Sequence, residues 1–245
     1  AGLNLKRALK PYIMNINGFK IGFFGFGWWI NECIYAGKDF PGVAPMDREV
    51  ILDLISFLKP LLDRLVLSFH WGYEYEKYPL PIHRDLAHTC IEKGADIIIG
   101  HHPHIIQVKE TYKNKPIYYS LGNFYFDSRR AKFTPSNSDK NMTSGYGLGV
   151  IYNPKTEETS EISLESDNEN SRITNTLEVE DISNIPTKYY NKFFLKNRTS
   201  KRKLGSKPNF LIGEKTNNKI KCFFCKIRRK MKLLIFNILE KLGFF

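Results

Sequence analysis

The chain has 245 residues, enough for one large domain or for one modest domain with an appended segment. Its formal net charge of +12 suggests nucleic-acid binding until the charge is divided along the chain. From residue 188 onward there are 17 Lys or Arg and two Glu, a balance of +15, whereas residues 1–187 carry 20 basic and 23 acidic side chains, a balance of −3. The basic character therefore belongs to the tail and does not indicate a domain that binds nucleic acid.

The four cysteines, at positions 33, 90, 222 and 225, give no disulfide framework for a chain of this size. Cys33 and Cys90 are predicted to be free thiols. Cys222 and Cys225 form a lone C-x-x-C without the further ligands that a structural zinc site needs. No stretch reaches the roughly 18 to 20 apolar residues of a membrane-spanning helix.

Apolar periodicity predicts an alternation of strands and helices along residues 19–100. Residues 19–27 read as a strand that ends in glycines, and Asp47 can cap a helix that runs from Arg48 to about Asp63. Further elements are a buried strand at 64–72, a helix at 81–94 that Gly94 ends, and strands at 95–100, 116–127, 145–153 and 159–166.

This order predicts the α/β class, with a parallel layer followed by β-rich structure. We expect a domain over residues 1–170, a polar and basic linker over 171–215, and a basic amphipathic helix over 216–245.

Four histidines follow two of the predicted strands. His70 closes the strand at 64–72, and the segment "IIIGHHPH" places His101, His102 and His104 directly after the strand at 95–100. In a parallel sheet both strand ends open on the same side, where α/β proteins build their sites. Neutral imidazole suits Zn, Fe, Mn or Ni, so this clustering favours a metal or phosphate-type site over isolated buried histidines. His83 and His88, on the intervening helix, are expected to have structural roles.

Two further side chains are candidates for catalysis. Glu74, just past His70, is suited to bind a metal or to act as a general base, although an ordinary loop charge is the competing interpretation. Asn123 follows a glycine at another strand end, where its amide is suited to bind a substrate oxygen. A turn residue that supports the sheet is an equally good interpretation of Asn123.

Three ordered segments, "HWGYEYEKYP", "LAHTCIEKGADIIIGHHPHIIQ" and "PIYYSLGNFYFD", resemble the CapA family of bacterial capsule and poly-γ-glutamate synthesis proteins. The resemblance covers about residues 2–153. It implies a layered α/β/β/α sandwich like that of the calcineurin-like metallophosphoesterases, here only in part, with a two-metal site at the strand ends.

By motif, the resemblance makes His70 a lone-histidine ligand and makes His102 and His104 the pair of a G-H-x-H motif. The extra histidine of "GHHPH" leaves His101 as an alternative to His102. The motifs of the first half of that domain, with its bridging aspartate, have no counterpart here. We therefore expect the chain to be the C-terminal part of a longer domain.

The resemblance implies a function in capsule or poly-γ-glutamate synthesis, with two divalent ions, Mn, Fe or Zn, assisting hydrolysis of a phosphoester or of an amide or ester in a surface polymer. Expected partners are that polymer or polysaccharide and the missing N-terminal half or other capsule-synthesis proteins. We expect a bacterial protein at the membrane or cell envelope, with a cytoplasmic location as the other option.

The competing hypothesis is a non-enzymatic, membrane-associated scaffold for polymer synthesis or export. It rests on residues 216–245, where apolar side chains recur at helical spacing among Lys and Arg, a pattern suited to anionic lipid surfaces or to packing on a partner. Nucleic-acid binding through the basic residues 196–208 rests on charge alone, and no nucleic-acid partner is expected.

Overall fold

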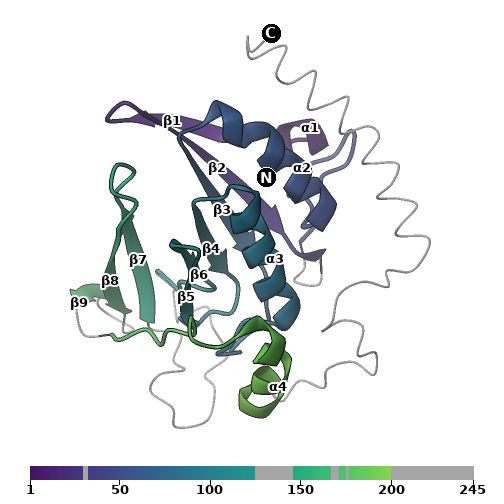
Figure 1. Cartoon of the computed structure of the whole chain (residues 1–245). Coiled ribbons are helices and arrows are strands. Elements are labelled where there is room, and N and C mark those ends of the chain that lie inside the picture. The colour runs from purple at the N-terminus through teal and green to yellow at the C-terminus, as the bar shows by residue number, and fades with distance from the viewer. Residues whose placement is uncertain (30–32, 125–145, 167–170, 175–176, 200–245) are drawn as a thin grey trace.

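A computed structural model describes residues 1–29, 33–124, 146–166, 171–174 and 177–199. Its centre is a six-stranded sheet in the order β1-β2-β3-β4-β6-β5 (Figure 1). The four inner strands are parallel, and the edge strands β1 and β5 pair antiparallel with β2 and β6. The strands are β1 (Tyr12–Ile16), β2 (Phe19–Gly27), β3 (Arg64–His70), β4 (Ile97–His101), β5 (Lys109–Tyr112) and β6 (Lys115–Tyr118).

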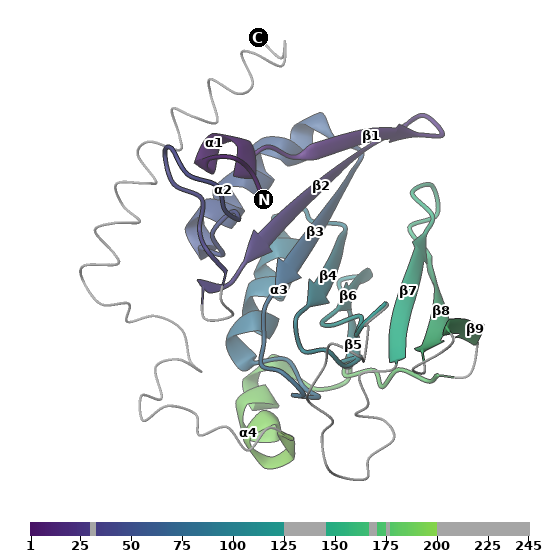
Figure 2. The same cartoon turned by 180° about the vertical axis from the view of Figure 1, so that it is seen from behind.

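The helices cover one face of this sheet, and a smaller sheet lies on the other side (Figures 1 and 2). The helices are α1 (Leu5–Ala8), α2 (Arg48–Leu58), α3 (Pro81–Lys93) and α4 (Thr187–Asn197), with a 3-10 turn, η2 (Lys59–Leu61), after α2. The smaller sheet has the order β7-β8-β9 and contains β7 (Tyr146–Tyr152), β8 (Thr159–Ser166) and β9 (Ser171–Thr174). The predicted α/β class is confirmed, and three layers of the expected sandwich are present in the described part of the chain.

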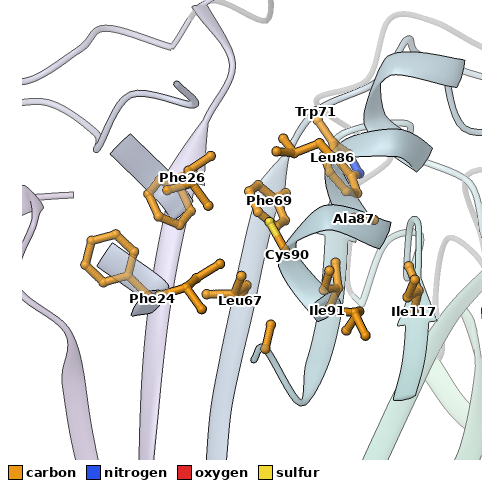
Figure 3. Close-up of a cluster of buried hydrophobic side chains, with 14 of the residues drawn as sticks. Phe24, Phe26, Leu67, Phe69, Trp71, Leu86, Ala87, Cys90, Ile91 and Ile117 are labelled. Carbon is orange, nitrogen blue, oxygen red and sulfur yellow. The ribbon is translucent and has the colours of Figure 1, made fainter. Parts of the chain in front are cut away.

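Each face of the large sheet has its own hydrophobic core. On the helical face, aromatic side chains of β2 and β3 share one core cluster with residues of α2 and α3, and Phe69 stacks on Phe26 and Trp71 (Figure 3). On the opposite face, Ile21, Val66 and Ile97 pack with Tyr118 and with Leu148 of β7. Both faces of β3 and β4 are therefore covered, which explains their nearly continuous apolar sequence.

Local sequence signals explain where the two long helices begin and end. The Asp47 side chain accepts a hydrogen bond from the backbone N–H of Val50 and caps α2. The predicted helix extended to about Asp63, but α2 ends at Leu58 and continues as η2, which contains Pro60. Gly94, with φ of 118°, ends α3 in the left-handed conformation, as predicted.

The structure differs from the predicted elements in the second half of the chain. The strand predicted at 116–127 is confined to Lys115–Tyr118, and residues 125–145 lie outside the described part. Within the range expected to be a linker, 171–215, the structure contains β9 and α4, and Tyr190 and Phe194 of α4 are buried in the core. The helix predicted at 216–245, with Cys222 and Cys225, lies outside the described residues.

Candidate functional site

The histidines gather at the carboxyl edge of the parallel strands. His70 is the last residue of β3 and His101 is the last residue of β4, and the two lie opposite each other in the strand register. His102 and His104 follow in the turn after β4. The prediction that the two strand ends bring these imidazoles to one place is confirmed, because adjacent parallel strands end at the same edge.

His70 and His102 are in direct contact across this edge. Nδ1 of His102 lies 3.1 Å from Nε2 of His70, and the ring centroids are 4.8 Å apart. The backbone of His102 has φ of 102°, and that of His104 has φ of 59°. Such values are strained for residues other than glycine, and strain of this kind concentrates at functional sites.

His104 is oriented by Asn123, which follows β6. Nδ1 of His104 lies 2.9 Å from the amide oxygen of Asn123. An amide oxygen only accepts hydrogen bonds, so Nδ1 carries the proton and donates, and in the neutral tautomer Nε2 has the lone pair that a metal ligand needs. Asn123 thus fixes the tautomer of a candidate ligand, as residues behind metal-binding histidines commonly do. Its predicted role in binding a substrate oxygen stays a prediction.

Burial favours the neutral form of two imidazoles at this edge, those of His70 and His101. Desolvation lowers the pKa of His70 below the usual value for histidine, and the charge of His104 lowers it further. Desolvation, followed by the charge of His70, likewise lowers the pKa of His101. Because only neutral imidazole binds a metal, these shifts favour the form that a ligand must have.

A tryptophan that the sequence analysis did not assign a role holds the strand ends together. The indole N–H of Trp71 donates to the carbonyl oxygen of Tyr119 at 2.9 Å, crossing over β4 at Gly100. A Cβ atom at Gly100 would lie 1.9 Å from that carbonyl oxygen and 2.5 Å from the indole nitrogen. The only sequence signal for this bridge was the position of Trp71 beside His70.

His83 is fully buried against the same tryptophan, as expected for a histidine with a structural role. Its ring stacks on Trp71 at a centroid distance of 5.0 Å and meets the edge of Trp28 at 4.7 Å. Desolvation, with a smaller effect of His102, lowers the pKa of His83 to about 3, so that the ring is neutral. His88 lies in a separate buried cluster with Glu110.

The structure does not test the predicted roles of the two remaining candidates, Glu74 and His101. Glu74 is half-buried in the loop that follows β3, where burial and the charge of Glu74 raise the pKa of neighbouring Tyr75. The role of Glu74 as a ligand or general base stays a prediction. His101 stays an alternative ligand, although the contact with His70 is made by His102.

The His70 and His102 nitrogens have a spacing that suits a shared cation. Two nitrogen atoms that bind one metal at about 2.0–2.1 Å lie about 2.9–3.4 Å apart, and these two lie 3.1 Å apart. Over the described ranges, no group of three or more His, Cys, Asp or Glu side chains is arranged to hold a metal ion. The described residues thus fit two positions of a metal site, with His104 and Asn123 beside them.

The sequence of residues 1–128 matches the family described as "Bacterial capsule synthesis protein PGA_cap". The chain is 41% identical over 128 residues to the PGA biosynthesis protein CapA of Bacillus subtilis, covering 52% of this chain and 34% of that protein. It is 40% identical over 131 residues to the capsule biosynthesis protein CapA of Bacillus anthracis, covering 52% of this chain and 32% of that protein. The chain therefore spans about a third of the length of these relatives.

Solved structures give weaker similarity. A putative 5'-nucleotidase from Staphylococcus aureus aligns with a TM-score of 0.36 and 14% identity over 76% of this chain and 33% of that chain. A hypothetical protein from Thermus thermophilus aligns with a TM-score of 0.34 and 11% identity over 67% of this chain and 59% of that chain.

Proposed function

Because the chain belongs to the bacterial capsule synthesis protein PGA_cap family, we propose that it supplies part of a metal-dependent hydrolytic site used in making a capsule or poly-γ-glutamate polymer. The bond cleaved would be a phosphoester, or an amide or ester of the polymer. The observation that carries this proposal is the 3.1 Å approach of His70 Nε2 and His102 Nδ1 at the ends of adjacent parallel strands.

In this proposal some residues of the site bind a cation and others orient its ligands. His70 and His102 would hold a divalent ion, Mn, Fe or Zn, and the complete domain would hold two such ions. When bound, such an ion would lower the pKa of a coordinated water and polarise the bond to be cleaved. Asn123 keeps the Nδ1 proton on His104, and Glu74 would accept the proton of the attacking water.

A non-enzymatic scaffold is the second candidate, and one observation favours it. The part of the chain that the structure describes brings together no group of three or more metal-ligating side chains of the His, Cys, Asp or Glu types. In this alternative the fold binds polymer or other capsule-synthesis proteins without cleaving a bond, and residues 216–245 contact the membrane surface. No helix among the described residues is both long and apolar enough to cross a membrane.

Hydrolysis by the purified full chain separates the two candidates. The chain is loaded with Mn²⁺, Fe²⁺ or Zn²⁺ and given bis-p-nitrophenyl phosphate or a γ-glutamyl p-nitroanilide. We expect product release that a chelator abolishes and that falls to the background rate in His70→Ala and His102→Ala. His101→Gln, one residue away in the same turn, is the matched control and should retain the rate.

Two results would count against the hydrolase. If no metal gives release above background, the scaffold is favoured, and flotation with liposomes of anionic lipid, with and without residues 216–245, then tests its membrane contact. If His102→Ala retains the full rate, the histidine pair does not carry the activity. Loss of the rate in His101→Gln alone would select His101 as the ligand.

A further inference from the structure

A segment outside the family match lies against the loop that follows β3. We call residues 177–199 the strap and residues 71–80 the site loop, which contains Glu74. The strap joins the edge strand β5 through two hydrogen bonds: Lys109 N–H to Glu180 O at 2.9 Å and Ile182 N–H to Lys109 O at 3.0 Å. It continues into α4, which lies near one end of α3 (Figure 1). Because the family match ends at residue 128, the match assigns no role to the strap.

Two residues of the strap, Glu180 and Tyr190, contact the C-terminal end of the site loop. Glu180 pairs with Lys77 at 2.6 Å and accepts a hydrogen bond from the Tyr78 hydroxyl at 3.3 Å. The Tyr190 hydroxyl donates to the Pro79 carbonyl oxygen at 2.8 Å, and the Tyr190 side chain is almost fully buried. Removal of the strap would therefore expose the loop end together with part of the core.

The last residue of the strap, Thr199, binds the middle of the site loop. Its backbone N–H donates to Glu76 Oε1 at 3.0 Å, and its hydroxyl accepts from the Lys77 N–H at 2.9 Å. The hydroxyl proton lies within reach of the Tyr75 carbonyl oxygen at 3.1 Å and of Glu76 Oε1 at 3.2 Å. Glu76 is completely buried, so these hydrogen bonds compensate for part of the cost of desolvating its carboxylate.

The site loop in turn contacts the turn that carries the histidines. The Tyr75 N–H donates at 2.9 Å to the carbonyl oxygen of Pro103, the residue between His102 and His104. Gly72 lies so close to Pro103 that a Cβ atom there would be 3.2 Å from the proline Cγ. The Gln107 amide also donates to the Glu76 carbonyl oxygen at 2.7 Å. A continuous series of contacts thus links Thr199 to the backbone of the histidine turn.

We propose that the strap positions the candidate metal site, with Thr199 and Glu76 as positioning residues that fix the site loop and, through Tyr75 and Pro103, the turn that carries His102 and His104. The consequence for metal binding rests on the proposed function. The claim that the strap holds the site loop and the histidine turn in place does not rest on the proposed function, because it concerns only how rigid these two loops are.

Hydrogen exchange and zinc affinity of the full chain test the proposal with three variants. Thr199→Val removes the hydroxyl, Thr199→Ser keeps it, and Ser183→Ala removes a strap hydroxyl that accepts from Thr111 on β5 instead of from the site loop. We expect about tenfold faster exchange in peptides covering 71–80 and 101–106 for Thr199→Val only. We also expect about tenfold weaker Zn²⁺ binding in that variant, measured by competition with a chelator.

The outcomes distinguish failure of the strap from failure of the metal site. If the unsubstituted chain binds no Zn²⁺, the proposed function fails. The hydrogen-exchange rates of the site loop and the histidine turn then decide the role of the strap by themselves. Equal exchange in Thr199→Val and Ser183→Ala, or faster exchange with unchanged Zn²⁺ affinity, would overturn the proposal. If Thr199→Val does not fold, Glu180→Gln replaces it, because it weakens the contacts with Lys77 and Tyr78, and the same direction of change is expected.

Discussion

Glu110 of β5 is the centre of a buried polar cluster beneath α3, and its replacement by Gln should strongly destabilise the fold. Its carboxylate accepts hydrogen bonds from Arg84 at 3.0 and 2.6 Å, from the Tyr119 hydroxyl at 2.7 Å, and makes a 2.9 Å contact with His88 Nε2. Arg84 and Glu110 side chains are each 2% exposed. Glu110→Gln leaves the Arg84 charge buried without its partner, which costs about 3–5 kcal/mol.

The pH dependence of this effect follows from the pKa of Glu110. Burial by itself raises that pKa, but hydrogen bonds from His88, Arg84 and Tyr119 lower it from 4.5 to about 2. The unfolded chain therefore binds the proton more tightly than the folded one. The stabilisation is complete above about pH 4.5 and is lost as the pH falls toward 2. Since one pKa unit is worth about 1.4 kcal/mol, the carboxylate contributes about 3 kcal/mol at neutral pH.

Urea unfolding of the full chain at pH 7, 5, 4 and 3 measures both effects. The difference in unfolding free energy between the unsubstituted chain and Glu110→Gln should be largest at pH 7 and 5 and should shrink below pH 4.5. Glu92→Gln is the control, because Glu92 forms a solvent-exposed pair with Lys113, and exposed pairs contribute little to stability. A loss in Glu110→Gln as small as that of the control, or one independent of pH, would show that the Glu110 carboxylate does not stabilise the buried Arg84 charge.

Two further predictions concern the packing of β4 and α3. Gly100→Ala should destabilise the chain by about 3 kcal/mol in urea unfolding, because the new methyl group would overlap the Tyr119 carbonyl oxygen. Unchanged stability would contradict the crossing of Trp71 over β4. Burial raises the pKa of the Cys90 thiol to about 12, so iodoacetamide at pH 8 should modify Cys90 only after the chain unfolds. Peptide mass spectrometry measures this modification, and modified Cys90 in the folded chain would contradict its burial.

The convergence of the histidines could be predicted because it depends on strand direction alone. Once residues 64–70 and 97–101 are assigned to neighbouring parallel strands, His70 and the "GHHPH" turn must meet at one edge. The choice between His101 and His102 could not be made from spacing. In the structure β4 ends at His101, and it is His102, with its positive φ, that contacts His70.

The strap could not be predicted because its sequence resembles a linker. In α4 the segment "TKYYNKFFLKN" is basic, and its two deeply buried residues, Tyr190 and Phe194, are four positions apart among exposed neighbours. Tyr190 lies against Arg84 of α3 and donates to Pro79 of the site loop, and the folded chain alone brings these two residues together. The short edge strands β1 and β5 were missed for a similar reason, since half-exposed strands of four or five residues carry little periodicity.

Metal content of the purified full chain shows whether His70 and His102 bind a metal ion. The chain is loaded with Mn²⁺, Fe²⁺ or Zn²⁺, dialysed and measured by elemental analysis beside the double variant His70→Ala, His102→Ala and the control His101→Gln. We expect stoichiometric metal in the unsubstituted chain and in the control, and none in the double variant. Equal metal content in all three, or none in the unsubstituted chain, would contradict the claim that His70 and His102 form a metal site.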